Sequence, residues 1–198
     1  MVPRGELEIG AGGWEPSIRR VLVYSSGLER VFPRGGFFAR PAPNERICVD
    51  WVCGACMAVR REQFLAMGGF DETFYVYAED MSFGRRVRGV GLRSVLRTDI
   101  TVPHSSGGSG APSAEMLRLR GASFAGYVMR YHPIAPALIM RGILAAGALC
   151  RGALQILKGD RAGARLNIAL VRGTMTQRAY VGGREVARAR FIDTATES

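Results

Sequence analysis

Two adjacent carboxylates, Glu79 and Asp80, are the residues of this sequence whose type and place best suit chemistry. They follow the aromatic run FYVYA and precede MSFGRR, which is rich in arginine. A carboxylate next to an attacking hydroxyl can act as a general base. The simpler interpretation is structural, because acidic side chains also favour the first turn of a helix. On these two residues alone, both interpretations stay open.

Further candidates flank the two acids in a fixed order along the chain. Trp51 and the small pair Gly54–Ala55 come first, GGFDE follows at 68–72, and His104 comes after the acids. Each has a simpler structural interpretation: a buried aromatic ring, a helix stop, and a histidine on a surface loop. Only the ordered combination indicates a function.

The elements that must position these residues are short. RICVDWVCGACMAV at 46–59 predicts two short strands or one kinked strand, broken at Gly54–Ala55. RREQFLAMGG at 60–69 predicts a short helix that ends at its glycine pair, followed by an aromatic loop. EDMSFGRRVRGVG at 79–91 predicts a helix whose first turn is acidic and whose later turns are basic, as the helix dipole favours.

The flanking segments carry weaker patterns. Residues 1–45 are rich in Gly, Pro and Arg, with roughly helical spacing over 18–32 and no clear strand. LRSVLR at 92–97 and DITVPH at 99–104 predict two short strands, and SSGGSGAPS at 105–113 predicts a flexible loop. The chemistry is therefore expected between residues 46 and 112.

The C-terminal part predicts helices. AEMLRLRGASFAGYVMRYHP at 114–133 is a helix that ends at its proline, and a long apolar segment follows at 134–157. That segment is long enough for a bilayer, at about 20 residues per span. Arg141 and Arg151 interrupt it, each costing about 2.5–3.5 kcal/mol near a membrane centre. A helix in the membrane interface, or a packed helix pair, is therefore favoured over a spanning one, and a helical appendage packed on the domain is an equal alternative.

The amino-acid composition limits the classes of binding partner that we expect. The net charge is +10, and Lys158 is the only lysine among 27 basic residues, so the arginine bias is typical of a GC-rich genome. We therefore expect no nucleic-acid partner, although the charge favours phosphates and acidic headgroups. Cys53 and Cys56 form a C-x-x-C that suits a redox pair or half a zinc site. No second such pair follows, so packing cysteines are the favoured interpretation.

In their order, these motifs resemble the C-terminal half of the family-2 glycosyltransferases, which are inverting nucleotide-sugar enzymes with a GT-A fold. The similarity covers about 49–110, carried by GGFDETFYVYAEDMSFGRR and VPHSSGGS, and is strongest to the rhamnosyl- and galactofuranosyl-transferase branch. It implies an α/β fold with a partial, Rossmann-like GT-A domain at 46–112. A linker-like remnant at 1–45 would replace the N-terminal nucleotide-binding half, and 113–198 would be a helical, membrane-associated tail.

The resemblance also implies roles. Asp80 would be the general base, held rigid and ionised at a helix start, and Glu79 would orient the base or the acceptor. His104 would complete a site for a divalent metal, Mn²⁺ or Mg²⁺. The residues implied in substrate binding are Trp51, Gly54, Ala55, Asp71 and Glu72.

The implied function is transfer of a sugar, with inversion, from a nucleotide-sugar donor to a hydroxyl of a glycan or lipid-linked acceptor. Such a protein would work in cell-wall or polysaccharide biosynthesis, in the cytoplasm at the inner face of the cell membrane. The alternative is a non-catalytic glycosyltransferase fragment or membrane-binding partner module.

Two features depart from the family pattern. Ser82 stands where the family usually has a further aspartate, and no D-x-D, the motif that holds the metal and diphosphate, occurs in the chain. We therefore expect the acceptor-side half of a truncated enzyme. Because its strands would lack a sheet to join, the isolated chain is predicted to be poorly soluble and inactive.

Overall fold

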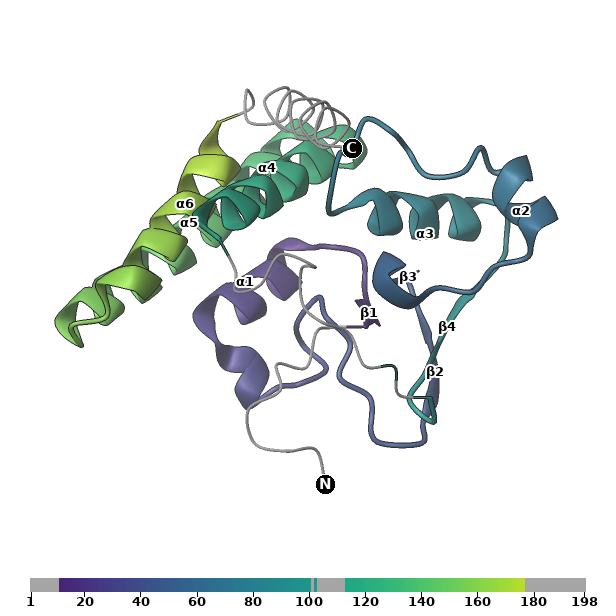
Figure 1. Ribbon diagram of the computed structural model, residues 1–198, viewed down its shortest axis with the longest axis horizontal. Coiled ribbons are helices and arrows are strands. Elements are labelled where there is room, and N and C mark those ends of the chain that lie inside the picture. Colours follow the sequence, from purple (N-terminus) through teal and green to yellow (C-terminus); the bar gives the residue numbers. More distant parts are fainter. Residues whose placement is uncertain (1–10, 101, 103–112, 177–198) are drawn as a thin grey trace, which may run out of the picture.

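The computed structural model describes residues 11–100, 102 and 113–176. Three long helices lie side by side on one side of the molecule: α4 (Ala114–Tyr131), α5 (Ile134–Leu157) and α6 (Arg161–Met175) (Figure 1). Helix α6 packs against both α4 and α5. We call α4, α5 and α6 the helical layer.

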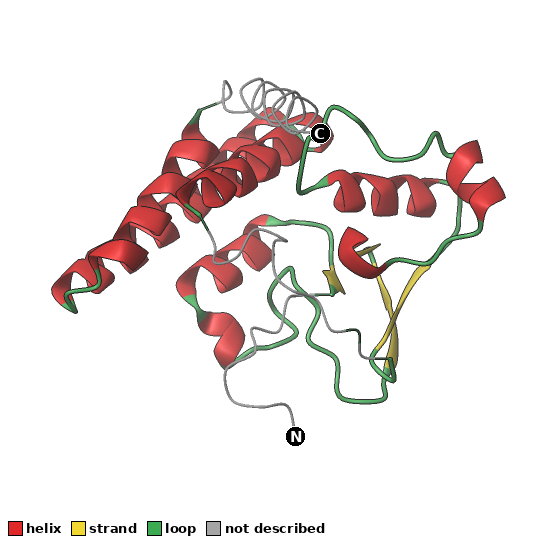
Figure 2. Cartoon of the chain, viewed as in Figure 1, coloured by secondary structure: helices red, strands yellow, loops and turns green. Residues whose placement is uncertain are grey.

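The other side of the molecule holds shorter elements (Figure 2). Its helices are α1 (Ile18–Ser26), α2 (Arg61–Ala66) and α3 (Glu79–Gly89), with the 3-10 turns η1 (Leu28–Arg30) and η2 (Gly54–Cys56). Its strands are β1 (Gly12–Gly13), β2 (Arg46–Val49), β3 (Trp51–Val52) and β4 (Ser94–Arg97). Strand β1 pairs with β3 and β2 pairs with β4, both antiparallel, with Arg46 opposite Arg97 and Val49 opposite Ser94.

Most predicted elements are present. Helices occupy the predicted segments at 60–69, 79–91 and 114–133, and the apolar segment at 134–157 is one helix. The strand predicted at 92–97 is β4, whereas Asp99 and Ile100 lie outside any strand. The rest of DITVPH, apart from Val102, lies outside the described residues, as does His104. The mixed helix–strand class is confirmed, and both sheets in the described part are two-stranded and antiparallel.

The N-terminal segment differs from the predicted linker-like remnant. It contains β1 and α1, and Val21 and Phe37 are buried in the same cluster as Trp51. The Ser17 hydroxyl caps α1 by accepting from the Arg20 N–H, and Gly27 ends the helix in the left-handed region. Strand β1 escaped prediction because it consists of two glycines, which carry no strand pattern.

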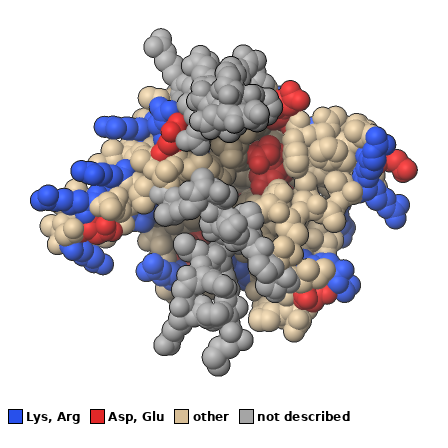
Figure 3. Space-filling view, in the orientation of Figure 1, with Lys and Arg blue, Asp and Glu red and all other residues tan. Residues whose placement is uncertain are grey.

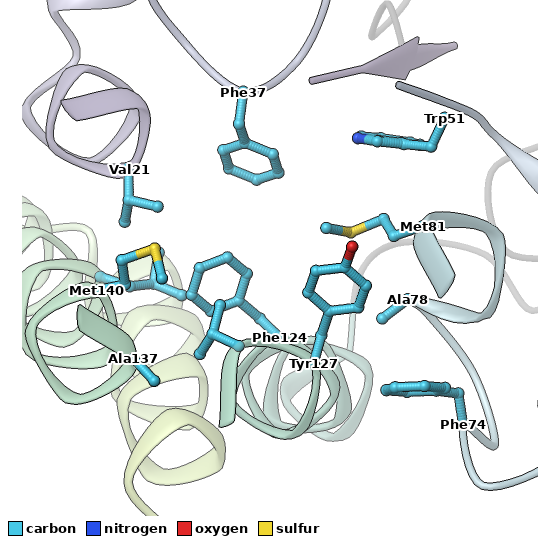
Figure 4. Packing of buried hydrophobic residues seen from close by; sticks show 12 residues of the cluster. Val21, Phe37, Trp51, Phe74, Ala78, Met81, Phe124, Tyr127, Ala137 and Met140 are labelled. Atoms are coloured by element: carbon cyan, nitrogen blue, oxygen red, sulfur yellow. The ribbon is translucent and has the colours of Figure 1, made fainter. Parts of the chain in front are cut away.

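One hydrophobic core joins the two sides. Tyr127 and Val128 from α4 are fully buried, as is Val21 from α1. Figure 4 shows the ring of Tyr127 reaching from α4 toward Met81 of α3. The residues of this cluster come from all three predicted regions, 1–45, 46–112 and 113–198. The described parts of these regions therefore pack as one unit. Its larger members are Val21, Phe37, Trp51, Phe74, Met81, Phe124, Tyr127, Val128, Met140 and Leu144.

The two arginines in the apolar helix α5 join helices together. Arg141, which is only 8% exposed, donates to the carbonyls of Thr174 and Met175 at the end of α6. Arg151 donates to the Ser25 carbonyl at the end of α1, at 2.7 Å. The last carbonyls of a helix lack partners within it and carry partial negative charge, so guanidinium groups suit these places. By length and composition α5 could cross a membrane, and here it packs within the helical layer.

Candidate active site

The two acids begin helix α3, as predicted. Its N-cap residue, Ala78, has φ of 70°, and Tyr77 before it has φ of 61°. Residues other than glycine rarely adopt this left-handed conformation, which costs on the order of 1–3 kcal/mol and often marks a functional site. The bend turns the chain from the aromatic loop directly into the helix that carries the carboxylates.

The Asp80 carboxylate is fixed by backbone donors. Its Oδ2 accepts from the Gly54 N–H at 3.2 Å, and its Oδ1 accepts from the Met81 N–H at 2.8 Å. Burial raises the pKa of Asp80 above its ordinary value, and these donors, with the charge of Arg120, oppose the rise. The helix start therefore orients the carboxylate, as expected. Contrary to our expectation, its pKa is raised and not lowered, because desolvation outweighs the donors.

Glu79 faces a cavity. Burial, together with the charge of Asp80, raises the pKa of Glu79 to about 6. Its Oε2 is buried without a hydrogen-bond partner in the described structure. Glu79 lines a cavity of about 430 Å³ together with Asp71, Glu72 and the aromatic residues Phe70 and Tyr75. Figure 3 shows acidic atoms at the surface of a hollow between the helical layer and the α2–α3 side. Carboxylates beside aromatic rings can hold the hydroxyls and the apolar face of a sugar.

Asp71 holds the loop that lines this cavity. Its carboxylate accepts from the Thr73 N–H at 3.0 Å and from the Thr73 hydroxyl at 2.6 Å. It also pairs with Arg130 of α4 at 3.2 Å. Asp71 thus joins the aromatic loop to the helical layer, whereas Glu72 is exposed on the same cavity.

Of the predicted small residues, Gly54 contacts the acids directly. A Cβ at Gly54 would lie 3.8 Å from Glu79 Oε1 and 3.9 Å from the Asp80 Cβ, so the glycine borders both carboxylates. Ala55 follows it in η2 and is exposed. Both therefore lie at the surface beside the acids.

Trp51 lies behind the site. Its side chain is 4% exposed, so the structure places it in the core and not on a substrate pocket. Its Nε1 donates to the Trp14 carbonyl at 3.2 Å. A Cβ at Gly84 would approach the Trp51 Cβ to 2.7 Å, so α3 rests closely on this residue. Trp51 thus supports the helix that carries the acids.

The surroundings of Ser82, which stands where the resembling family has a further aspartate after the acid pair, suit a serine. It is fully buried, and its hydroxyl shares a hydrogen bond with the Tyr131 hydroxyl at 2.8 Å. A carboxylate here would have to be desolvated, at a large cost in free energy. The serine instead ties α3 to α4.

Two arginines near the site were not predicted. Arg86 of α3 donates to the carbonyls of Met67 and Gly69 at 2.5 and 2.6 Å, which holds the glycine turn after α2. Arg120 of α4 lies with its guanidinium carbon 5.5 Å from the Tyr77 ring centroid. The sequence offered no signal for Arg120, because 40 positions separate it from the acids and only the fold brings it close.

The described residues do not by themselves form a metal site. Within 11–100, 102 and 113–176, no three His, Cys, Asp or Glu side chains gather closely enough to hold an ion. His104 lies outside these ranges. Cys53 and Cys56 are free thiols, and burial raises the pKa of Cys53, which favours the neutral thiol over a metal-binding thiolate.

Comparisons with known proteins place this site in a wider context. The sequence model of glycosyl transferase family 21 matches residues 24–179. A segment of 65 residues is 42% identical to N-acetylglucosaminyl-diphospho-decaprenol L-rhamnosyltransferase of two Mycobacterium tuberculosis strains, covering 33% of this chain and 21% of that protein. A segment of 58 residues is 40% identical to O-antigen biosynthesis protein RfbC of Myxococcus xanthus, covering 29% of this chain and 4% of that protein. No solved structure matches the chain.

Proposed function

The chain belongs to glycosyl transferase family 21, and on that premise we propose that it supplies the base and the acceptor side of an inverting sugar transfer. The donor would be a nucleotide sugar and the acceptor a hydroxyl of a glycan or lipid-linked saccharide in cell-wall or polysaccharide biosynthesis. The curated relatives favour this assignment, since one is named for transfer of rhamnose to a decaprenol-linked sugar. The matched segment covers only 21% of that relative's length. The activity of a complete enzyme is therefore part of the proposal.

The observation that carries the proposal is the geometry of the acid pair. Asp80, held by the Gly54 and Met81 N–H groups, takes the proton of the acceptor hydroxyl. The hydroxyl oxygen then bonds to the anomeric carbon as the bond from that carbon to the diphosphate breaks, which inverts the configuration. A raised pKa makes Asp80 a stronger base than an exposed aspartate. Glu79, on the neighbouring cavity, binds a second hydroxyl of the acceptor and so positions it.

The proposal also includes a divalent cation, Mn²⁺ or Mg²⁺. Its only support is the resemblance to glycosyltransferases and the presence of His104. The step above is assigned to the protein's own residues. Chelation with EDTA, followed by restoration with each metal, tests the requirement, and His104→Ala is expected to weaken the response to Mn²⁺.

We also propose that the protein acts in the cytoplasm, against the inner face of the cell membrane. Ile134, Leu138, Leu149 and Ile156 are exposed on α5. At 3.6 residues per turn these four positions fall on one side of the helix. Such an apolar side suits a helix that lies in the membrane interface.

The test of the reaction is a transfer assay on membranes from cells that express the chain at high level and from cells that lack it. Labelled nucleotide sugars are supplied one at a time, and incorporation into the lipid and glycan fractions is measured. We expect incorporation from one donor to follow expression, with the product anomer opposite to that of the donor in its NMR spectrum. Retained configuration, or no expression-dependent transfer from any donor, would contradict the proposal.

A further inference from the structure

A second cavity lies between the α1–η1 segment and the helical layer. Its volume is about 310 Å³, and it is separate from the cavity that Glu79 lines. Three arginines, Arg30, Arg120 and Arg151, and one acid, Glu29, are among its lining residues. Three positive charges against one negative charge leave a net charge of +2 around the cavity. Such a lining favours a ligand that carries more than one negative charge.

The arginines retain donors for such a ligand. Within the described structure, Arg30 and Arg120 have exposed side chains and form no ion pair. Arg151 uses Nη1 to donate to the Ser25 carbonyl, and its planar guanidinium carries further N–H groups. Guanidinium groups bind phosphate oxygens in a two-pronged geometry, and three of them around one cavity favour a multiply charged group such as a diphosphate over a single-charge anion.

The cavity also has an aromatic wall and an unused acceptor. Tyr24 and Phe37 pack edge to face, with ring centroids 4.7 Å apart, and the Phe38 ring lies tilted against that of Phe37, with centroids 4.3 Å apart. Glu29 pairs with Arg40 through Oε1, whereas its buried Oε2 lacks a partner in the described structure. The wall offers an apolar surface and the carboxylate oxygen can accept from a ligand hydroxyl or N–H. A phosphate ester with an apolar or aromatic group matches both features.

Arg120 connects this cavity with the acids. It lines the cavity, its guanidinium lies over Tyr77 just before the acid pair, and its charge acts on the Asp80 carboxylate. A group bound at Arg120 would therefore lie near the reacting centre.

We propose that the cavity lined by Arg30, Arg120 and Arg151 binds a diphosphate ester, with the guanidinium groups on the diphosphate and the aromatic wall on the esterified group. This inference rests on the proposed sugar transfer. It adds a binding site distinct from the acid pair. Two substrates of such a reaction can carry this chemistry: a nucleoside diphosphate from the donor and a prenyl diphosphate from a lipid-linked acceptor. A volume of about 310 Å³ lies at the lower end of small-molecule pockets, about 300–1,000 Å³, and holds the diphosphate with the nearest part of the ester.

The test is calorimetric titration of the full chain with inorganic pyrophosphate, uridine diphosphate and geranyl diphosphate. We expect at least one ester to bind more tightly than pyrophosphate, because the aromatic wall adds to the charge interaction. Arg30→Gln and Arg120→Gln are each expected to weaken the binding of that ester by about tenfold or more, because each variant loses one charged hydrogen bond to the ligand. Arg165→Gln is the matched control, since this exposed arginine of α6 does not line the cavity.

The two esters identify the source of the ligand. Tighter binding of geranyl diphosphate assigns the cavity to the acceptor lipid, and tighter binding of uridine diphosphate assigns it to the donor. The inference is overturned if neither ester binds, or if Arg30→Gln and Arg120→Gln bind as tightly as Arg165→Gln. Because the titration needs no turnover, its failure leaves the transfer assay untouched, and failure of transfer leaves the titration interpretable.

Discussion

Glu79 and Asp80 are neighbours in sequence, yet the structure gives them different surroundings. Asp80 is held by two backbone N–H groups. Glu79 has one oxygen without a partner in the described structure and faces a cavity. Two acids whose environments differ in this way can take different roles in one reaction. We assign the proton transfer to Asp80 and the positioning of the acceptor to Glu79.

The pH dependence of stability tests the surroundings of Glu79. Its folded-state pKa of about 6 lies above the ordinary 4.5, so its proton stabilises the fold below pH 4.5. That contribution is lost as the pH rises from about 4.5 to 6, because the buried side chain must then carry a charge. Glu79→Gln should therefore raise the free energy of unfolding relative to wild type at pH 7 and change it little at pH 4. Urea denaturation at both values measures this, and an equal difference at both would contradict the assignment.

At the scale of elements, helix α3 places the acids because it rests on β3 at a glycine. A Cβ at Gly84 would meet the Asp50 carbonyl oxygen and would lie 2.7 Å from the Trp51 Cβ. The absence of a side chain at this position lets the helix approach the strand. The first turn of α3 is thereby brought to Gly54, whose N–H reaches Asp80.

Alanine substitutions in α3 test this contact. Gly84→Ala should lower the free energy of unfolding by about 1–3 kcal/mol, the usual range for overpacking. Gly89→Ala is the control on the same helix, since its added Cβ would meet no atom within 4 Å beyond its chain neighbours and its own helix backbone. It should be neutral or stabilise by up to about 1 kcal/mol through helix propensity. Similar effects of the two substitutions in chemical denaturation would show that α3 does not need this close approach.

The elements that the sequence predicted well are those with strong local patterns. The acidic start and basic end of α3 and the proline after α4 mark real helix ends. Strand β1 and the core positions of Val21 and Phe37 had no such pattern, because they depend on partners far along the chain. The site residues divide in the same way. The acids and Gly54 come together, whereas Trp51 is buried beneath them and Arg120 arrives through tertiary packing alone.

At the scale of the whole molecule, Glu15 joins its parts. Its carboxylate accepts from the Tyr127 hydroxyl at 2.9 Å and from His132 Nε2 at 3.2 Å, both on or next to α4. It also pairs with Arg85 at 2.9 Å and with Arg88, both on α3. One side chain from the N-terminal segment thus connects the helix that carries the acids to the helical layer.

Glu15→Gln tests this connection. The amide keeps the shape but removes the charge partner of Arg85 and one of the two carboxylates near Arg88, which also pairs with Asp50. We expect a loss of about 2 kcal/mol in the free energy of unfolding, between the values for exposed and buried ion pairs. Glu62→Gln, on the exposed surface of α2, is the control and should change stability little. Equal stabilities of the two variants in urea denaturation would contradict a central role for Glu15.

The apolar side of α5 is tested with lipid vesicles. The protein should float with vesicles of phosphatidylcholine and phosphatidylglycerol. The double substitution of Leu138 and Leu149 by glutamate should reduce the bound fraction, because it places two charges on the exposed apolar side. Val95→Glu, on the exposed face of β4, is the control. Membrane contact through α5 would be contradicted if the double variant and the control floated equally with the vesicles.

The central claim is that Asp80 is the base of a sugar transfer, and the most direct measurement is the transfer rate after its chromosomal codon is changed to asparagine. Membranes from Asp80→Asn cells should transfer sugar at least about a hundredfold more slowly, within the usual contribution of a general base, with donor binding unchanged. Asp99→Asn, which alters a surface carboxylate paired with Arg97, should transfer at the wild-type rate. Wild-type transfer by Asp80→Asn would contradict the claim.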